Sequence, residues 1–258
     1  MSWWPALTLW QREMVRFLRQ RDRLLGALLT PVVFWWLLGA GLGKSFQGPG
    51  TPTGHGYLEF FFAGTVMMIL LFTAIFSTIS VIEDRREGFL QGVLVAPVGP
   101  VALVLGKVLG GTTLAVGQAM VFTAFAPLIG LTLSVTAVAW LVLVMTLSAL
   151  ALTALSFVFA WWMNSSQGYH AIMNLVLLPL WLLSGAVFPL AGASAPLRWV
   201  MRLNPVTYGV TAIRHGLYWQ QPLGPEDGLA LAITALFAIA MLGLALAITR
   251  RTTGGDHP

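Results

Sequence analysis

The sequence predicts an all-α membrane protein with six transmembrane helices, and two observations carry that prediction. Of the 258 residues, 57% are hydrophobic and only 9% are charged, which leaves too few polar side chains to cover a soluble domain. Apolar runs of about 20 residues recur along the chain, and that length crosses a hydrocarbon core of about 30 Å. The runs lack the alternation of barrel strands, so they form helices that satisfy their own backbone hydrogen bonds in lipid. We expect one transmembrane domain over residues 1–258.

The six apolar runs define the expected spans. They cover residues 24–43, 57–82, 101–129, 131–163, 171–190 and 228–249. A charged loop, residues 83–100, separates the second and third spans, and a longer segment, residues 191–227, separates the last two. Because an odd number of crossings lies between them, the loop and the longer segment are expected on opposite sides of the membrane.

The distribution of Lys and Arg predicts the orientation. With the N-terminus in the cytoplasm, ten of the 14 basic residues fall on the cytoplasmic side, and four fall outside: Lys44, Arg198, Arg202 and Arg214. This asymmetry favours cytoplasmic N- and C-termini. The formal net charge of +5 then reflects arginines that meet anionic lipid headgroups, so no nucleic-acid partner is expected. We expect an integral protein of the cell membrane, which in a bacterium is the inner membrane.

Residues 1–23 predict an amphipathic helix that lies in the cytoplasmic headgroup layer. At about 100° per residue, apolar side chains gather on one face: Trp3, Leu7, Trp10, Met14 and Phe17. Arginines gather on the opposite face: Arg12, Arg16, Arg19 and Arg23. Tryptophan on the apolar side and arginine on the polar side are typical of interfacial helices, which bind membrane lipids.

The loop after the second span concentrates charge in an otherwise apolar chain. Five charged residues follow one another from Glu83 to Glu87, and the sequence favours a helix from Glu83 to Leu94 that Pro97 and Pro100 end. No segment of the chain is polar enough to be a soluble energy-coupling domain. Energy for transport would therefore come from another subunit.

Two stretches resemble one family. Residues 83–107, EDRREGFLQGVLVAPVGPVALVLGK, resemble the cytoplasmic loop of ABC-2 type transporter permeases, the six-helix membrane subunits of certain ATP-driven exporters. The matching positions are Glu83 to Glu87, Gly88, Leu90, Leu94, Pro97, Gly106 and Lys107. Residues 203–218, LNPVTYGVTAIRHGLY, resemble the segment before that family's last span, with matches at Asn204, Pro205, Tyr208 and Arg214. The chain departs from the family at Phe89 and Gln91, where Thr and Glu are common.

The resemblance implies a transport complex. A second permease copy, identical or paralogous, would complete the membrane unit, and a pair of cytoplasmic ABC ATPase subunits would dock on it. ATP and Mg²⁺ would bind to those subunits. This chain is therefore expected to hold no cofactor, no metal ion and no catalytic residue.

In that family the cytoplasmic loop is a coupling helix, on which the ATPase subunits push to tilt the spans. Charged residues would recognise the ATPase, and apolar residues would be buried in the contact. The resemblance implies this role for Glu83, Asp84, Arg85, Arg86, Glu87, Phe89, Leu90 and Leu94. The alternative is a solvated loop whose arginines only follow the preference for basic residues on the cytoplasmic side.

The segment over residues 191–227 contains two helix-sized pieces, each too short to span the membrane, separated at Asn204. The resemblance implies short re-entrant helices that dip into the outer leaflet and cap the transport pathway. The residues expected at this outer gate are Trp199, Asn204, Pro205, Tyr208 and Arg214. A surface lid without a role in transport is the alternative.

Two other classes of membrane protein are alternatives. A secondary carrier or a lipid scramblase would need no ATPase, but carriers place charges deep in their spans. Here only Glu59 and Lys107 occur, each near a span end where it can reach the interface. An intramembrane protease would need a nucleophile and a base, but Ser165, Ser166 and His170 fall in a tight turn without the surrounding motif. The scarcity of buried charge favours an amphipathic, lipid-like or drug-like cargo over a small ion, and the resemblance implies that this cargo leaves the cytoplasm.

Overall fold

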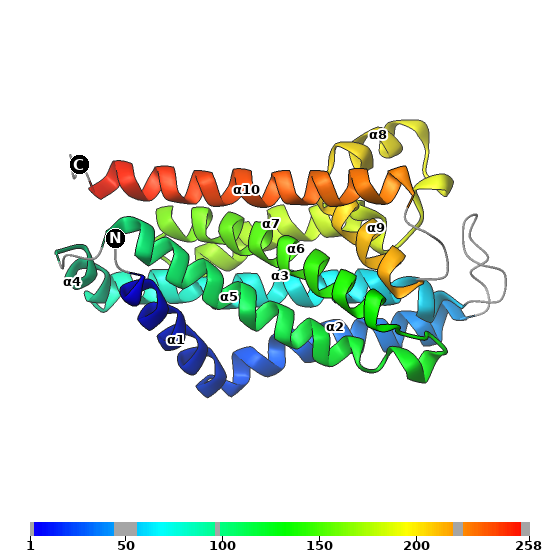
Figure 1. Cartoon of the computed structure of the whole chain (residues 1–258), viewed down its shortest axis with the longest axis horizontal. Coiled ribbons are helices and arrows are strands. Elements are labelled where there is room, and N and C mark those ends of the chain that lie inside the picture. Colours follow the sequence, from blue (N-terminus) through cyan, green and yellow to red (C-terminus); the bar gives the residue numbers. More distant parts are fainter. Residues whose placement is uncertain (1–2, 44–55, 96–98, 219–223, 254–258) are drawn as a thin grey trace.

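Figure 1 shows the computed structural model of the chain, which describes residues 3–43, 56–95, 99–218 and 224–253. Every regular element in these ranges is a helix. The long helices are α2 (Arg21–Leu42), α3 (Tyr57–Arg86), α5 (Pro100–Thr123), α6 (Val135–Trp162), α7 (Ser166–Trp181) and α10 (Pro225–Thr253). The shorter helices are α1 (Trp4–Arg19), α4 (Phe89–Val95), α8 (Ala195–Leu203) and α9 (Pro205–Leu217). Two 3₁₀ turns (Ala126–Ile129 and Leu190–Gly192) and a π-helical turn (Leu182–Ala186) complete the described elements.

Six helices are long and apolar enough to cross a membrane: α2, α3, α5 with the 3₁₀ turn that follows it, α6, α7 with its π-helical turn, and α10. The all-α prediction with six spans is confirmed. Successive spans run in opposite directions, as Figure 1 shows. The start of α1, the end of α10 and all of α4 lie at one end of the bundle, and α8 and α9 lie at the other. We call these the inner end and the outer end, after the predicted orientation.

Helix α3 forms the centre of the bundle, where it packs against α2, α5, α6 and α7. Small residues allow close contact between these helices. At Gly64 a Cβ atom would lie 2.8 Å from the Cβ of Ala186, and at Gly111 it would lie 2.7 Å from Thr153 Cγ2. Helices α2 and α10 lie at the periphery and leave many apolar side chains exposed. Lipid or another chain would cover those faces.

Helix α1 packs along α5 at the inner end. Its buried residues are Ala6, Leu9, Glu13 and Phe17. Gly106 of α5 makes the close approach possible, because a Cβ atom there would lie 2.5 Å from the Cβ of Leu9. The buried side of α1 therefore faces its own bundle, and the contact with lipid headgroups stays a prediction for the exposed side.

The helix expected from Glu83 to Leu94 is two helices in the structure. Helix α3 continues to Arg86, and α4 begins at Phe89. Gly88 separates them with a φ of 76°, a left-handed conformation that glycine adopts without steric penalty and that commonly ends helices. Most of the expected coupling charges thus belong to the last turn of a span.

Candidate functional site

Charged side chains from four helices converge at the inner end of the bundle. We call them the inner ion cluster: Arg12, Glu13 and Arg16 of α1, Arg23 of α2, Glu83 and Asp84 of α3, and Lys107 of α5. Two of the acids end α3, and the bases come from the three helices around that end. The cluster therefore ties α1, α2, α3 and α5 together.

Asp84 is the centre of the inner ion cluster. Its side chain is fully buried and accepts hydrogen bonds from three basic residues. Arg12 donates from both Nη atoms, at 2.8 and 3.0 Å, and Arg16 donates from Nη1 at 2.6 Å. Lys107 Nζ also donates to this carboxylate. The hydrogen bond with Asp84 raises the pKa of Arg12 above its ordinary value, so the guanidinium stays charged.

Lys107 is buried, and two acids hold it inside the protein. Its Nζ donates to Glu13 Oε1 at 2.8 Å and to Ser80 Oγ at 3.1 Å, in addition to the contact with Asp84. Ser80 Oγ in turn donates to Glu13 Oε2 at 2.6 Å. The prediction that Lys107 reaches the interface is therefore wrong. The sequence signal for its partner was Glu13, the single acid among the first 20 residues.

Glu83 joins α3 to the junction of α1 and α2. Its carboxylate accepts from Arg16 Nη2 at 2.8 Å and from Arg23 Nη1 at 3.3 Å. The sequence placed the arginines of the N-terminal helix on a face turned toward lipid headgroups. In the structure Arg12, Arg16 and Arg23 turn toward the acids of α3 instead, and Arg19 is exposed. The carboxylates of Glu83 and Asp84 attract these side chains because a charged partner offsets part of the cost of removing a carboxylate from water.

The next two residues of α3 connect it to the turn between α6 and α7. Arg85 Nη1 donates to the carbonyl of Met163 at 3.1 Å, and its Nη2 donates to the carbonyl of Trp161. Arg86 Nε donates to the carbonyl of Asn164 at 3.0 Å. The last turn of α3 is thus bonded to α1, α2 and α5 through its acids and to the α6–α7 turn through its arginines.

Helix α4 presents one face to the bundle and one to solvent. Phe89 lies under the guanidinium of Arg12, whose Cζ is 3.8 Å from the ring centroid, and Leu90 is buried in the core. Among the described residues in and around α4, those exposed to solvent are Arg86, Glu87, Gly88 and Gly92. We call this solvent-facing surface, which lies at the inner end of the bundle, the α4 outer face. The side chain of Leu94 lies outside the described residues. Of the residues expected to dock an ATPase, the structure therefore brings Arg86 and Glu87 to the surface, leaves Glu83 half-buried in the inner ion cluster, and places Asp84 and Leu90 inside.

At the outer end, α9 closes the broken end of α7. Helix α7 gives way to the π-helical turn, in which Gly185 has a φ of 77°. Two side chains of the α8–α9 segment donate to carbonyls there: Asn204 Nδ2 to Leu180 at 2.5 Å and Arg214 Nη2 to Gly185 at 2.9 Å. A helix end inside an apolar bundle needs such donors, because its last carbonyls have no partner within the helix.

The residues expected at the outer gate fall into two groups. Asn204 and Arg214 point inward, and Arg214 also lies over the ring of Phe60, with Cζ 4.5 Å from the centroid. Pro205 begins α9, and Tyr208 Oη donates to the carbonyl of Arg202 at 2.8 Å near the surface. Trp199 of α8 is 65% exposed and stands apart from the others. Its depth in the outer leaflet stays a prediction.

The sequence is similar to one family over most of its length. The model of the ABC-2 type transporter family matches residues 6–218, a range that holds the inner ion cluster, α4 and the α7–α9 contact. Nodulation protein J of Rhizobium meliloti (strain 1021) is 26% identical over 256 residues, which cover 96% of this chain and 94% of that protein. Nodulation protein J of Rhizobium leguminosarum bv. trifolii is 28% identical over 216 residues, or 81% and 79% of the two chains. That of Neorhizobium galegae is 26% identical over 262 aligned positions, or 96% and 93%.

Proposed function

Because the chain belongs to the ABC-2 type transporter family, we propose that it is the permease subunit of an exporter driven by separate ATPase subunits. Family membership makes the chain a membrane component of a transporter and assigns ATP hydrolysis to a partner subunit. The finer parts of the proposal are the direction of transport, the docking surface, the cargo and the orientation in the membrane.

The last turn of α3 is the observation that supports a coupling role. Its four charged residues, Glu83 to Arg86, bond to α1, α2, α5 and the α6–α7 turn. Helix α4 follows after two residues, Glu87 and Gly88, and also contacts α1 through the Phe89–Arg12 pair. A force on α4 would therefore act on five of the six spans at their inner ends. This arrangement suits a part that transmits the closing motion of an ATPase dimer to the membrane helices.

We infer that the ATPase pair docks on the α4 outer face, with ATP and Mg²⁺ held by the ATPase. Arg86 and Glu87 supply charge there, and Gly92 leaves space for a partner's side chain. The half-buried Glu83 and the buried Asp84 and Leu90 support this surface from behind rather than contact the partner. A second permease copy, identical or paralogous, and membrane lipids would cover the exposed apolar faces of α2 and α10.

The proposed cargo is an amphipathic, lipid-like or drug-like molecule. Within the described residues of the spans, the buried charges are Asp84 and Lys107, and both lie at the inner end and neutralise each other. A small ion would need charged ligands deeper in the bundle. An exported amphiphile does not, because an apolar pathway already matches its hydrocarbon part.

The docking proposal predicts a specific effect of bulk on α4. In Gly92→Trp, the new side chain points into open space in the described part of the permease, since no atom of the described residues lies within 4 Å of a Cβ built there. It would collide with an ATPase seated on the α4 outer face. We expect co-purification of the ATPase to weaken by tenfold or more, which corresponds to about 1.4 kcal/mol. The measurement is co-purification at matched permease abundance together with ATP hydrolysis.

A matched control is Gly117→Trp in α5. Gly117 is also exposed, helical and free of atoms within 4 Å of its Cβ position, but it lies within a span. This variant should keep wild-type ATPase association. Equal association for both variants would show that the ATPase docks elsewhere.

The orientation is open to a direct test because the chain contains no cysteine. Single cysteines at Gln11, Ser194 and Arg251 occupy exposed sites in α1, just before α8 and in α10. On intact cells, a maleimide that cannot cross the membrane should label only Ser194→Cys, and the other two should label after permeabilisation. Labelling of Gln11→Cys or Arg251→Cys on intact cells would reverse the assignment of the inner end.

A further inference from the structure

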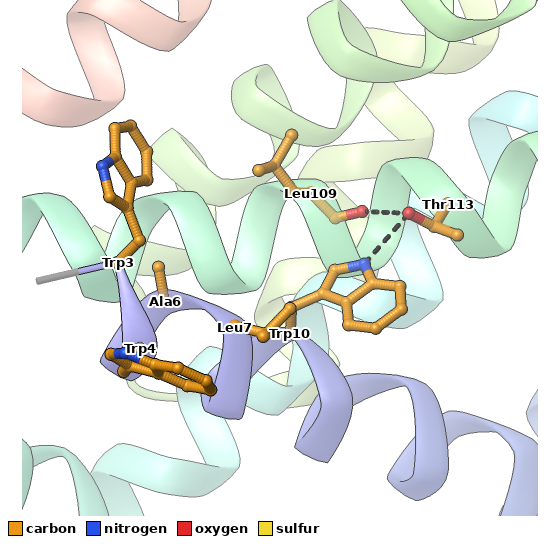
Figure 2. A pocket seen from close by; sticks show the side chains of 7 residues that line it. All are labelled: Trp3, Trp4, Ala6, Leu7, Trp10, Leu109 and Thr113. Atoms are coloured by element: carbon orange, nitrogen blue, oxygen red, sulfur yellow. Dashed lines mark hydrogen bonds between the residues drawn. The ribbon is translucent and has the colours of Figure 1, made fainter.

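An apolar groove runs between α1 and α5 at the inner end, as Figure 2 shows. Its volume is about 560 Å³, within the range of pockets that hold small ligands. Among the residues that the structure describes, its walls and floor come from Trp3, Trp4, Ala6, Leu7 and Trp10 of the α1 segment and from Leu109 and Thr113 of α5. In Figure 2 the three indole rings are spread around the groove, with Trp3 at the upper left, Trp4 below it and Trp10 at the right, and Leu109 lies at the top.

The groove offers almost no polar partner to a ligand. Trp10 Nε1 donates to Thr113 Oγ1 at 3.1 Å, and Thr113 Oγ1 donates to the carbonyl of Leu109 at 2.8 Å. Both polar side chains of the floor are therefore satisfied within the protein. The rings of Trp3 and Trp4, each 76% exposed, extend the apolar wall outward. A ligand of this groove must be hydrocarbon where it lies between the helices.

The position of the groove indicates where that hydrocarbon comes from. Its floor belongs to a membrane span, and its wall carries indole rings, which favour the boundary between headgroups and acyl chains. Exposed basic residues lie on the helices near the groove: Arg19 and Arg21 where the far end of α1 meets α2, and Arg250 and Arg251 at the inner end of α10. Such residues attract anionic lipid headgroups.

We propose that the α1–α5 groove binds one acyl chain of an anionic phospholipid from the inner leaflet. The acyl chain lies against Leu7 and Leu109. The lipid headgroup stays outside the groove among the exposed arginines. The lipid thus completes the packing of α1 on α5, which the structure leaves open on this side. This inference rests on the proposed orientation of the inner end, and the cysteine labelling described above tests that orientation separately.

The test uses the complete permease in nanodiscs of phosphatidylcholine that contain phosphatidylglycerol with a photoactivatable acyl chain. After irradiation, cross-linked residues are mapped by mass spectrometry. We expect cross-links at Leu7 and Leu109, and a loss of them in Leu109→Trp, whose larger ring fills the groove. The control is Val121→Trp, another exposed apolar position of α5 outside the groove, and it should keep the cross-links.

A second pair of measurements tests the headgroup. Photoactivatable phosphatidylcholine should label the groove less than phosphatidylglycerol, and this preference should disappear in the double variant Arg19→Gln, Arg21→Gln. Labelling spread evenly along the exposed face of α5, or unchanged by Leu109→Trp, would overturn the acyl-chain site. Equal labelling by the two wild-type probes would overturn the choice of an anionic lipid. None of these readouts depends on transport or on the ATPase.

Discussion

Replacing Asp84 by leucine should destabilise the folded permease by about 3–5 kcal/mol, the usual effect of removing one partner from a buried ion pair. The fully buried carboxylate accepts from Arg12, Arg16 and Lys107, and its removal leaves those cations without their shared partner. The effect can be measured by heating the purified permease and monitoring the loss of its monodisperse peak in size-exclusion chromatography. We expect a large fall in Tm and reduced abundance in the membrane.

Glu87→Gln is the control for that variant. Glu87 is also an acid at the end of α3, but its side chain is 62% exposed and its nearest cation, Arg16, is 3.8 Å away. An exposed pair of this kind contributes about 0–1 kcal/mol, so Tm should hardly change. The substitution Lys107→Met should lower the stability of the Asp84→Leu variant by less than it lowers the stability of the wild type, because the two residues share one interaction. If Asp84→Leu unfolds like the wild type, the inner ion cluster does not hold the four helices together.

Asn204→Leu should have the second largest effect, about 2–4 kcal/mol. The asparagine has two roles: its Oδ1 accepts from the backbone N–H of Val206 at 3.0 Å and caps α9, and its Nδ2 donates to the carbonyl of Leu180. Loss of a cap costs about 0.5–2 kcal/mol. A buried carbonyl left without a donor adds about 1–3 kcal/mol. The same unfolding measurement applies.

Tyr208→Phe is the matched variant for the outer end. It removes a hydrogen bond to the carbonyl of Arg202 near the surface, where water can replace the hydroxyl, and we expect a loss below about 1 kcal/mol. A protease accessibility assay on the outer face would separate the two variants further. Only Asn204→Leu should expose the α8–α9 segment to cleavage, and similar stability of both variants would argue against the role of Asn204 in holding α7.

The six spans were predictable because each is a local property of the sequence. An apolar run of sufficient length needs no tertiary information to be recognised, and the observed helices overlap all six predicted ranges. The split between α3 and α4 was less evident, although Gly88 carried the signal. Glycine permits a left-handed turn, but a helix can also continue through glycine. The sequence alone therefore does not decide whether the helix ends at this position.

The inner ion cluster could not be predicted from any single segment. Arg12 and Asp84 are separated by 72 residues, and Glu13 and Lys107 by 94. Helical periodicity shows that the arginines of α1 share a face, but it cannot show whether that face meets water, lipid or another helix. The packing of α1 on Gly106 decides this, and glycines in an apolar run carry no obvious indication of which helix they admit.

The contact between α7 and α9 also sets an order of events during synthesis. The carbonyl of Gly185 accepts a hydrogen bond from Arg214, which the ribosome adds 29 residues later. At a translation rate of about 5–20 residues per second, this delay is about 1.5–6 s. Gly185 also leaves the ribosome before Arg214 by this interval, and its carbonyl lacks this donor meanwhile. The contact is therefore incomplete until α9 emerges, and a product truncated between α8 and α9 would lack this donor permanently.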